Sequence, residues 1–227
     1  MKLKDKVVVV TGSSSGIGKS TAKLFAEKGS KVIVTYNKGE EKGREVMEYC
    51  EEKSESMLTR LDVTDKSSIE KSLEEIKERF GNVDILINNA GILESGKLED
   101  LSHDKIEKQI DVNLTGLINT SKIFLESMLD RDEGMIINIS SGLGKSGSAR
   151  YSVYSATKFG VRGFTQSLAK ELPRGFRTYV VNPGMTSTRM TDYSGTDPKN
   201  VAKVIVKTAR EDFDKRSGED IDVGEYI

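Results

Sequence analysis

Apolar residues fall into two alternating patterns along this chain. Short runs dominated by valine and isoleucine recur as KVVVVT, KVIVTY, VDILIN, GMIINIS and RTYVVN, and a weaker run, SMLTRLDV, precedes the third of these. The charged segments between them carry apolar residues three or four positions apart, most clearly from Lys66 to Phe80, where Ile69, Leu73 and Ile76 share one face. Continuous apolar runs predict strands buried on both faces, and the wider spacing predicts amphipathic helices.

This alternation of strand and helix predicts an α/β fold. We expect a doubly wound parallel sheet of about six or seven strands, with helices covering both of its faces. The chain has 227 residues, which is enough for one domain with a sizeable core and too short for two domains of ordinary size. Residues 1–227 are therefore expected to form a single domain.

Composition and charge exclude several classes of function. There are 35 Lys and Arg residues against 36 Asp and Glu, so no positive excess is available for nucleic acid or an anionic membrane. Cys50 and His103 are the only residues of their types, which excludes an intrachain disulfide and a Cys/His metal cluster. No apolar stretch approaches the ~18 residues of a membrane span, and the N-terminal run is too short for a signal peptide. We expect a soluble, cytoplasmic protein without a metal.

Two glycine clusters compete for the role of a phosphate-binding turn. The first, TGSSSGIGKS, lies between a predicted strand and a predicted helix, where free N–H groups and the helix dipole favour an anion. Gly12 would permit the tight turn, Gly16 the approach of a pyrophosphate, and Gly18 close packing of the helix on the strand. The hydroxyls of Ser13, Ser14 and Ser15 could add donors.

The second cluster has the literal spacing G-x-G-x-x-G, at Gly142, Gly144 and Gly147. It follows a late strand, but no further strand and crossover of the right length come after it, so we interpret it as a flexible loop without a phosphate role. The first cluster also ends in Gly-Lys-Ser, as in P-loop nucleotidases. That loop needs a glycine where Ser13 stands, so the register is wrong by one residue, and Lys19 is better interpreted as a solvated helix residue.

Tyr154 and Lys158 form a candidate catalytic pair. The same spacing occurs at Tyr49 and Lys53, so the pattern alone is weak. Tyr154 differs because Ser141 lies thirteen residues upstream, at the end of the run GMIINIS, where ligands of open parallel sheets bind. Ser140 remains an alternative for the active hydroxyl.

The chemical argument for this pair concerns the pKa of the phenol. A free phenol titrates near ~10, and lowering that pKa by ~3 units requires ~4 kcal/mol of preferential stabilisation of the phenolate. An ammonium group ~4 Å away, at an effective dielectric constant near ~20, supplies about that amount. Lys158 is therefore expected to lower the pKa of Tyr154, and Ser141 to hold the oxygen of a carbonyl substrate.

Along nearly its whole length the sequence resembles the short-chain dehydrogenases/reductases. The matching motifs, in order, are TGSSSGIG, Asp62-Val63, NNAG from Asn88 to Gly91, Asn113 within DVNLTG, Ser141, YSATK and NPGMTST. The resemblance implies a Rossmann fold of about seven strands and a nicotinamide cofactor. It also implies that Tyr154 is the general acid/base, that Lys158 additionally binds the nicotinamide ribose, that Ser141 positions the substrate and that Asn113 supports a proton-relay water.

The resemblance also assigns cofactor contacts. Asp62 and Val63 would contact the adenine, Asn89 to Gly91 would lie along the cofactor, and Pro183, Gly184 and Thr188 would border the nicotinamide. Asn88 and Asn89 have the alternative role of capping a strand. The full set of expected cofactor-binding residues is Gly12, Ser13, Ser15, Gly16, Ile17, Gly18, Tyr36, Asn37, Lys38, Asp62, Val63, Asn89, Ala90, Gly91, Tyr154, Lys158, Pro183, Gly184 and Thr188.

The end of the second strand predicts a preference for NADP(H) over NAD(H). Selectivity for NAD comes from an acidic residue at that point, which would repel a 2′-phosphate. Tyr36, Asn37 and Lys38 stand there instead, and Lys38 with Ser13 could bind the phosphate. The segment contains no arginine for a bidentate contact.

We therefore expect an NADP(H)-dependent carbonyl reductase or alcohol dehydrogenase that acts on a small molecule and forms a homodimer or homotetramer. A non-catalytic nucleotide sensor and a P-loop nucleotidase are the alternatives. The expected substrate loop, residues 189–197, is short, which predicts an open site that accepts bulky carbonyl compounds. The tail SGEDIDVGEYI resembles the family's closing strand and stops soon after it.

Overall fold

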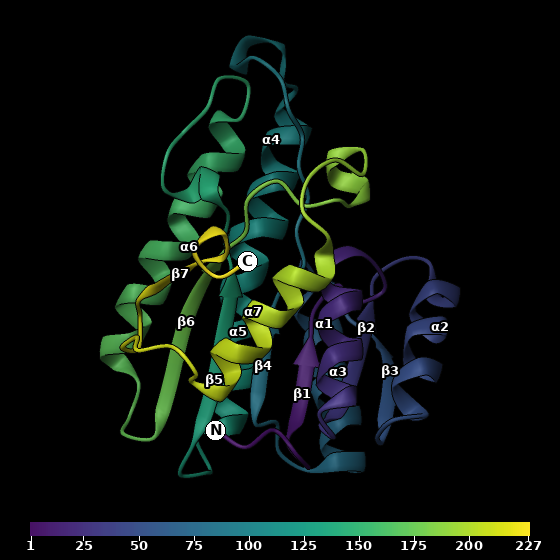
Figure 1. The fold of residues 1–227 in the computed structure, drawn as a ribbon. Helices are drawn as coiled ribbons and strands as arrows, with labels where there is room; N and C mark the ends of the chain where they lie inside the picture. The colour runs from purple at the N-terminus through teal and green to yellow at the C-terminus, as the bar shows by residue number, and fades with distance from the viewer.

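The computed structural model describes residues 1–227 as one α/β unit built on a single parallel sheet (Figure 1). Its seven strands occur in the order β3-β2-β1-β4-β5-β6-β7, and every pairing is parallel. This confirms the predicted doubly wound sheet. The strands are β1 (Val7–Val10), β2 (Lys31–Tyr36), β3 (Ser56–Arg60), β4 (Ile85–Asn88), β5 (Gly134–Ile139), β6 (Phe176–Asn182) and β7 (Asp220–Asp222).

Seven α-helices connect or extend these strands. They are α1 (Gly16–Glu27), α2 (Glu40–Glu51), α3 (Lys66–Phe80), α4 (His103–Ile110), α5 (Gly116–Met128), α6 (Ser152–Glu171) and α7 (Pro198–Arg210). Helix α3 has the bounds that the apolar spacing predicts. None of these helices combines the length and the apolar composition that a membrane-spanning segment requires.

The two faces of the sheet are covered by different sets of helices. Val8 and Val10 pack in one buried cluster with residues of α1, α2 and α7, whereas Val7 and Val9 pack in a second cluster with residues of α3, α5 and α6. Neighbouring side chains of a strand point to opposite faces, so a strand covered on both sides must be apolar at every position. This is the physical reason for the continuous valine run of β1.

The order of the strands reverses next to β1. From β1 the chain proceeds outward through β2 and β3, then returns to place β4 on the other side of β1 and continues outward to β7. In an open parallel sheet, the crevice beyond the carboxyl ends of the strands at such a reversal binds ligands. The turns after β1 and β4, which carry Gly12 and Asn89, meet at this point.

The second glycine cluster is more ordered than predicted. Gly142–Gly144 form a 3-10 helix directly after Ser141, and Gly144 is buried. A Cβ atom at Gly144 would lie 2.5 Å from Ser140 Oγ and 2.9 Å from the carbonyl oxygen of Lys158. The interpretation of this cluster as a flexible loop is therefore wrong for Gly142–Gly144, because these residues form a 3-10 turn that packs tightly against α6 at Gly144.

Candidate active site

The first glycine cluster forms the turn that opens α1. Gly12 and Gly16 have φ angles of 65° and 56°, in the left-handed region that glycine adopts without strain. Ser15, at the N-cap of α1, makes no side-chain capping bond, and the first turn contains no acidic residue. The N–H groups at a helix start have no partner within the helix, so this end of α1 is suited to an anion.

The contacts of Ser13 correct the expectation that its hydroxyl binds a phosphate. Ser13 is fully buried; its Oγ donates to the carbonyl of Val10 at 2.8 Å and accepts from the N–H of Thr35 at 2.8 Å. Thr35 Oγ1 in turn accepts from the N–H of Gly12 at 3.0 Å. Ser13 and Thr35 therefore anchor the glycine turn to β1 and β2, and the Ser13 side chain does not face a ligand.

The turn after β4 is tied to the turn after β1. Thr11 Oγ1 accepts from the N–H groups of Asn89 and Ala90, both at 2.9 Å, and Asn89 Nδ2 donates to the Thr11 carbonyl at 2.8 Å. Asn88 is buried, and its amide donates to Ser121 and Asn138. Both asparagine side chains thus brace the sheet, which leaves the backbone of this turn as the part that can lie along a cofactor.

Four residues with proposed chemical roles come together beyond β5. Ser141 follows β5, Tyr154 and Lys158 share one face of α6, and Asn113 lies in a π-helical turn between α4 and α5. Tyr154 and Lys158 are buried, at 8% and 5% exposure, and Ser141 lies close enough to Tyr154 to affect the pKa of its phenol. A Cβ atom at Gly91 would lie 3.3 Å from Asn113 Oδ1 and 3.8 Å from Lys158 Nζ, so the turn after β4 reaches the same place.

The expected lowering of the Tyr154 pKa is absent from this structure. Burial raises the pKa of Tyr154 above its ordinary value, and the neighbouring Ser141 hydroxyl offsets only part of that rise. Burial also lowers the pKa of Lys158 to about 8. Lys158 Nζ lies 5.7 Å from the centre of the Tyr154 ring and donates to the carbonyl of Ile139 at 2.9 Å. The low dielectric of the site disfavours both charges, an effect that the sequence argument left out.

The side chain of Asn113 is hydrogen-bonded within the protein. Its Oδ1 accepts from the N–H of Ile92 at 2.8 Å, its Nδ2 donates to the Ile92 carbonyl at 2.9 Å, and Thr157 Oγ1 is 3.4 Å away. Asn113 is 1% exposed. It therefore braces the turn after β4 against α6.

The structure distinguishes the two candidate serines. Ser140 is 3% exposed and its Oγ donates to the carbonyl of Lys158 at 2.9 Å. Ser141 is only partly buried, accepts from the N–H of Leu143 at 3.1 Å, and lies close to Tyr154. Ser140 fastens β5 to α6, whereas Ser141 shares the polar site with Tyr154.

An arginine that the sequence argument missed lies at the end of β2. Arg60, from the neighbouring strand β3, donates to the main-chain carbonyl and the side-chain Oδ1 of Asn37, each at 3.4 Å, and is 3.9 Å from Asp62. Strand pairing explains the placement, because Tyr36 is the direct partner of Arg60. The signal was the register between two parallel strands, which no local motif contains.

The segment after β6 packs against the turns that carry Ser141 and Gly16. The Pro183 carbonyl accepts from the N–H of Gly142 at 2.9 Å, and Thr188 Cγ2 would lie 3.2 Å from a Cβ atom on Gly16. The expected substrate loop contains a 3-10 helix, Arg189–Thr191, and Thr191 Oγ1 contacts the carbonyls of Thr186, Thr188 and Ser194. This short loop is therefore held by its own hydrogen bonds.

Comparison with known proteins agrees with this geometry. The family model described as short chain dehydrogenase matches residues 6–199. The 3-oxoacyl-(acyl-carrier-protein) reductase FabG of Vibrio cholerae is 41% identical over 192 residues, which cover 84% of this chain and 78% of that protein. The chain belongs to the short-chain dehydrogenase family.

Two further relatives of this short-chain dehydrogenase span almost its full length. An uncharacterised oxidoreductase of Staphylococcus saprophyticus is 37% identical over 215 residues, 91% of this chain and 92% of the relative. A short-chain dehydrogenase from Burkholderia cenocepacia, solved in complex with NADP, is similar with a TM-score of 0.90 and 30% identity, covering 98% of this chain and 97% of that one. The protein is an oxidoreductase with a Rossmann-type fold.

The residues at the carboxyl end of the sheet fit the nicotinamide cofactor that this family uses. The start of α1 offers uncapped N–H groups, and the glycines of its turn leave space for a close approach of the pyrophosphate. The Lys158 ammonium has three donors, of which the protein uses one, on Ile139. The remaining donors of this buried group suit the hydroxyls of a ribose.

The two glycine clusters are expected to respond differently to alanine. At Gly144 the added Cβ atom would overlap Ser140 and α6, so we expect a loss of about 1–3 kcal/mol in stability and a lower kcat. At Gly147 no atom lies within 4 Å, so the substitution should be neutral. Gly16→Ala should instead weaken the binding of the cofactor directly, because it adds backbone strain and bulk at the turn that faces the pyrophosphate.

Thermal unfolding, kcat and cofactor titration of the three variants test this separation. Weaker cofactor binding in Gly147→Ala than in Gly16→Ala would show that the phosphate site has been assigned to the wrong cluster.

Proposed function

We propose that this protein is an NADP(H)-dependent carbonyl reductase in which Tyr154 is the general acid. The observation that carries the proposal is the meeting of Tyr154, Lys158 and Ser141 in one buried polar site at the carboxyl end of β5. The bound cofactor supplies the hydride to the carbonyl carbon. The chain's own residues supply the proton and hold the reacting oxygen.

Each residue has a separate part in the proton transfer. Ser141 and Tyr154 would donate hydrogen bonds to the carbonyl oxygen and hold it still. Lys158 would bind the ribose and place a positive charge near the phenol, so that negative charge on Tyr154 Oη costs less as its proton leaves. Asn113 and Thr157 would keep α6 and the turn after β4 in register behind them.

The titration state of the site favours the reductive direction. Because burial raises the pKa of Tyr154, its phenol carries a proton at neutral pH and is ready to act as an acid. Oxidation of an alcohol needs the phenolate instead. The rate of oxidation should therefore rise with pH while the phenol is still protonated.

The charges at the end of β2 support a preference for NADPH. Arg60 joins Tyr36, Asn37 and Lys38 there, and its hydrogen bonds to Asn37 are long, at 3.4 Å. Its side chain is 56% exposed, so the planar guanidinium can turn to a 2′-phosphate and bind it through two N–H groups. The relative solved with NADP lends further support.

We expect kcat/KM to be about tenfold to a hundredfold higher with NADPH than with NADH, which corresponds to about 1.4–2.7 kcal/mol. Arg60→Leu should raise the Kd for NADPH about tenfold and leave the Kd for NADH unchanged, because only NADPH carries a 2′-phosphate. Arg79→Leu is the matched control, since Arg79 has a similar exposure of 51% and pairs with Glu51 on α2. Tyr36→Asp should shift the preference toward NADH.

Titrating both cofactors with the wild type and these variants decides the point. Equal or better binding of NADH by the wild type would contradict the proposed cofactor, and equal effects of Arg60→Leu on both cofactors would contradict the role of Arg60.

The substrate, the assembly and the cellular site stay predictions. The similarity to FabG and to levodione reductase, the latter at 26% identity and a TM-score of 0.90, supports a small carbonyl compound as substrate. A homo-oligomer, a cytoplasmic location and acceptance of bulky carbonyls remain expectations. A non-catalytic sensor is disfavoured because the tyrosine, lysine, serine and asparagine are all present and assembled.

A further inference from the structure

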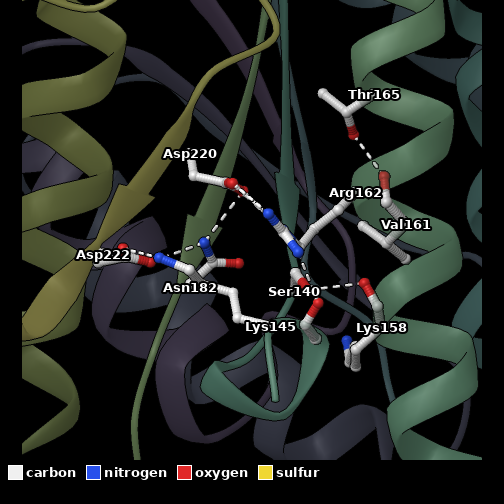
Figure 2. A network of polar contacts seen from close by, with 10 residues as sticks. Ser140, Lys145, Lys158, Val161, Arg162, Thr165, Asn182, Asp220 and Asp222 are labelled. Carbon is white, nitrogen blue, oxygen red and sulfur yellow. Dashed lines mark hydrogen bonds and ion pairs between the residues drawn. The ribbon is translucent and has the colours of Figure 1, made fainter. Parts of the chain in front are cut away.

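A ring of polar contacts lies beside the proposed active site and includes residues to which neither the motifs nor the mechanism above gives a role (Figure 2). It connects α6, the turn after β5, the end of β6 and the strand β7. Its members are Gly144, Lys145, Arg162, Asn182, Asp220 and Asp222.

Arg162 is the centre of the ring. Its Nε donates to Asp220 Oδ1 at 2.9 Å, its Nη2 to Asp220 Oδ2 at 2.6 Å, and its Nη1 to the carbonyl of Gly144 at 2.8 Å. The two charged side chains are mostly buried, with 19% and 21% exposure. A two-pronged, largely desolvated contact of this kind fixes geometry well, because either partner left alone would be a buried unpaired charge.

The remaining contacts close the ring through β6 and β7. Asn182 Nδ2 donates to Asp220 Oδ1 at 3.1 Å and to Asp222 Oδ1 at 2.9 Å. Lys145 Nζ pairs with the carboxylate of Asp222. Lys145 follows Gly144 in the chain, so the turn after β5 is held at two adjacent residues, one through Arg162 and one through β7.

This ring bears directly on Ser141. The 3-10 turn begins at Ser141, whose carbonyl accepts from the N–H of Gly144 at 2.8 Å. Arg162 lies four residues beyond Lys158, one turn further along the same face of α6. Together with the Ser140–Lys158 hydrogen bond, the Arg162–Gly144 contact therefore fixes the turn that carries Ser141 relative to the helix that carries Tyr154 and Lys158.

We propose that Arg162, held by Asp220 of the C-terminal strand, is a positioning residue that keeps the Ser141 hydroxyl in place relative to Tyr154. This inference rests on the proposed function. It gives β7 a part in the reaction, although β7 contributes no residue to the site itself. A displacement of about 1 Å at a reacting group can lower the rate as much as ~10²-fold. The Arg162–Gly144 contact can therefore affect the rate although Arg162 does not touch the reacting atoms.

A double-mutant cycle between Arg162 and Ser141 tests the proposal. In the full chain with saturating NADPH, Arg162→Met should lower kcat about 10- to 100-fold while the Kd for NADPH, measured by titration, changes less than about twofold. In a Ser141→Ala background, Arg162→Met should lower kcat less than about threefold, because the hydroxyl that Arg162 positions is already missing. Arg162→Lys keeps the charge without the fork and should fall between Arg162→Met and the wild type.

Lys6→Met is the matched control. Lys6 is also a partly buried cation that joins two acids, Asp84 and Glu133, but it precedes β1 at the opposite end of the strands. Lys6→Met should lower the melting temperature without lowering kcat.

Three results would overturn the role of Arg162. These are an unchanged kcat in Arg162→Met, an equal loss in both backgrounds, or a fall in kcat for Lys6→Met as large as that for Arg162→Met. If Arg162→Met does not fold, Arg162→Lys in the two backgrounds gives the same comparison. A wild type that does not reduce carbonyls with NADPH would instead refute the proposed function.

Discussion

Tyr154→Phe is expected to lower kcat by about 10²- to 10⁴-fold while the fold and the affinity for NADPH are kept. The substitution removes only the Oη atom and its proton, and the buried ring keeps its packing in α6. The pH dependence should change with it. Alcohol oxidation by the wild type should speed up about tenfold per pH unit up to a pH of about 8, where Tyr154 is still protonated and Lys158 still charged, and the variant should lose that rise.

Tyr49→Phe is the control for this experiment. Tyr49 has the same spacing from a lysine, and Lys53 Nζ lies 5.6 Å from its ring centre, close to the distance in the Tyr154 pair. Its hydroxyl, however, bonds to Glu27 on the outside of α1 and α2. Turnover of Tyr154→Phe within about twofold of the wild type, or a comparable loss in Tyr49→Phe, would remove the basis for assigning Tyr154 as the acid.

Lys158→Met is expected to change stability and activity in opposite directions. A shift of the Lys158 pKa from 10.5 to about 8 means that the folded protein holds this buried charge at a cost of about 3 kcal/mol near neutral pH. Methionine removes the charge but also the hydrogen bond to Ile139, worth about 1 kcal/mol. The free energy of unfolding should rise by about 1–2 kcal/mol, while kcat falls by at least about 10²-fold.

The higher stability of Lys158→Met should depend on pH within a defined interval. The folded pKa of Lys158 lies below the unfolded one, so the unfolded chain binds more protons between them and the wild type gains stability as pH rises through that interval. The difference in the free energy of unfolding between variant and wild type should be largest below a pH of about 8 and should shrink as the pH approaches 10.5. Chemical denaturation at several pH values measures it; a variant less stable than the wild type at neutral pH would contradict the account.

The sequence predicted the fold because its signals are local. The continuous valine run of β1 and the apolar spacing of α3 follow from periodicity alone, and both elements occur where it places them. Their order then leaves few topologies, and the observed sheet is the doubly wound one. The motifs also named Ser141, Tyr154 and Lys158, which the structure brings to one site.

The parts that the sequence did not predict depend on contacts between distant segments. Ser13 stands among donors in the glycine turn, but its side chain faces Thr35 of the next strand. Arg60 reaches Asn37 only through the pairing of β2 with β3. Gly144 is ordered because α6 covers it, and the partners of Arg162 come from segments 18 and 58 residues away. A pattern within one segment contains no information about such neighbours.

The most direct test of the central claim is the transfer of deuterium from NADPH labelled on the reactive carbon of the nicotinamide to a carbonyl substrate. A panel of ketones, sugars and acyl thioesters would be incubated with the wild type and with Tyr154→Phe, and the products analysed by mass spectrometry. The account predicts an alcohol that carries one deuterium on the former carbonyl carbon with the wild type, and a rate lower by about 10²-fold or more with the variant. Tight binding of NADPH without transfer to any member of the panel, or equal transfer by the variant, would contradict it.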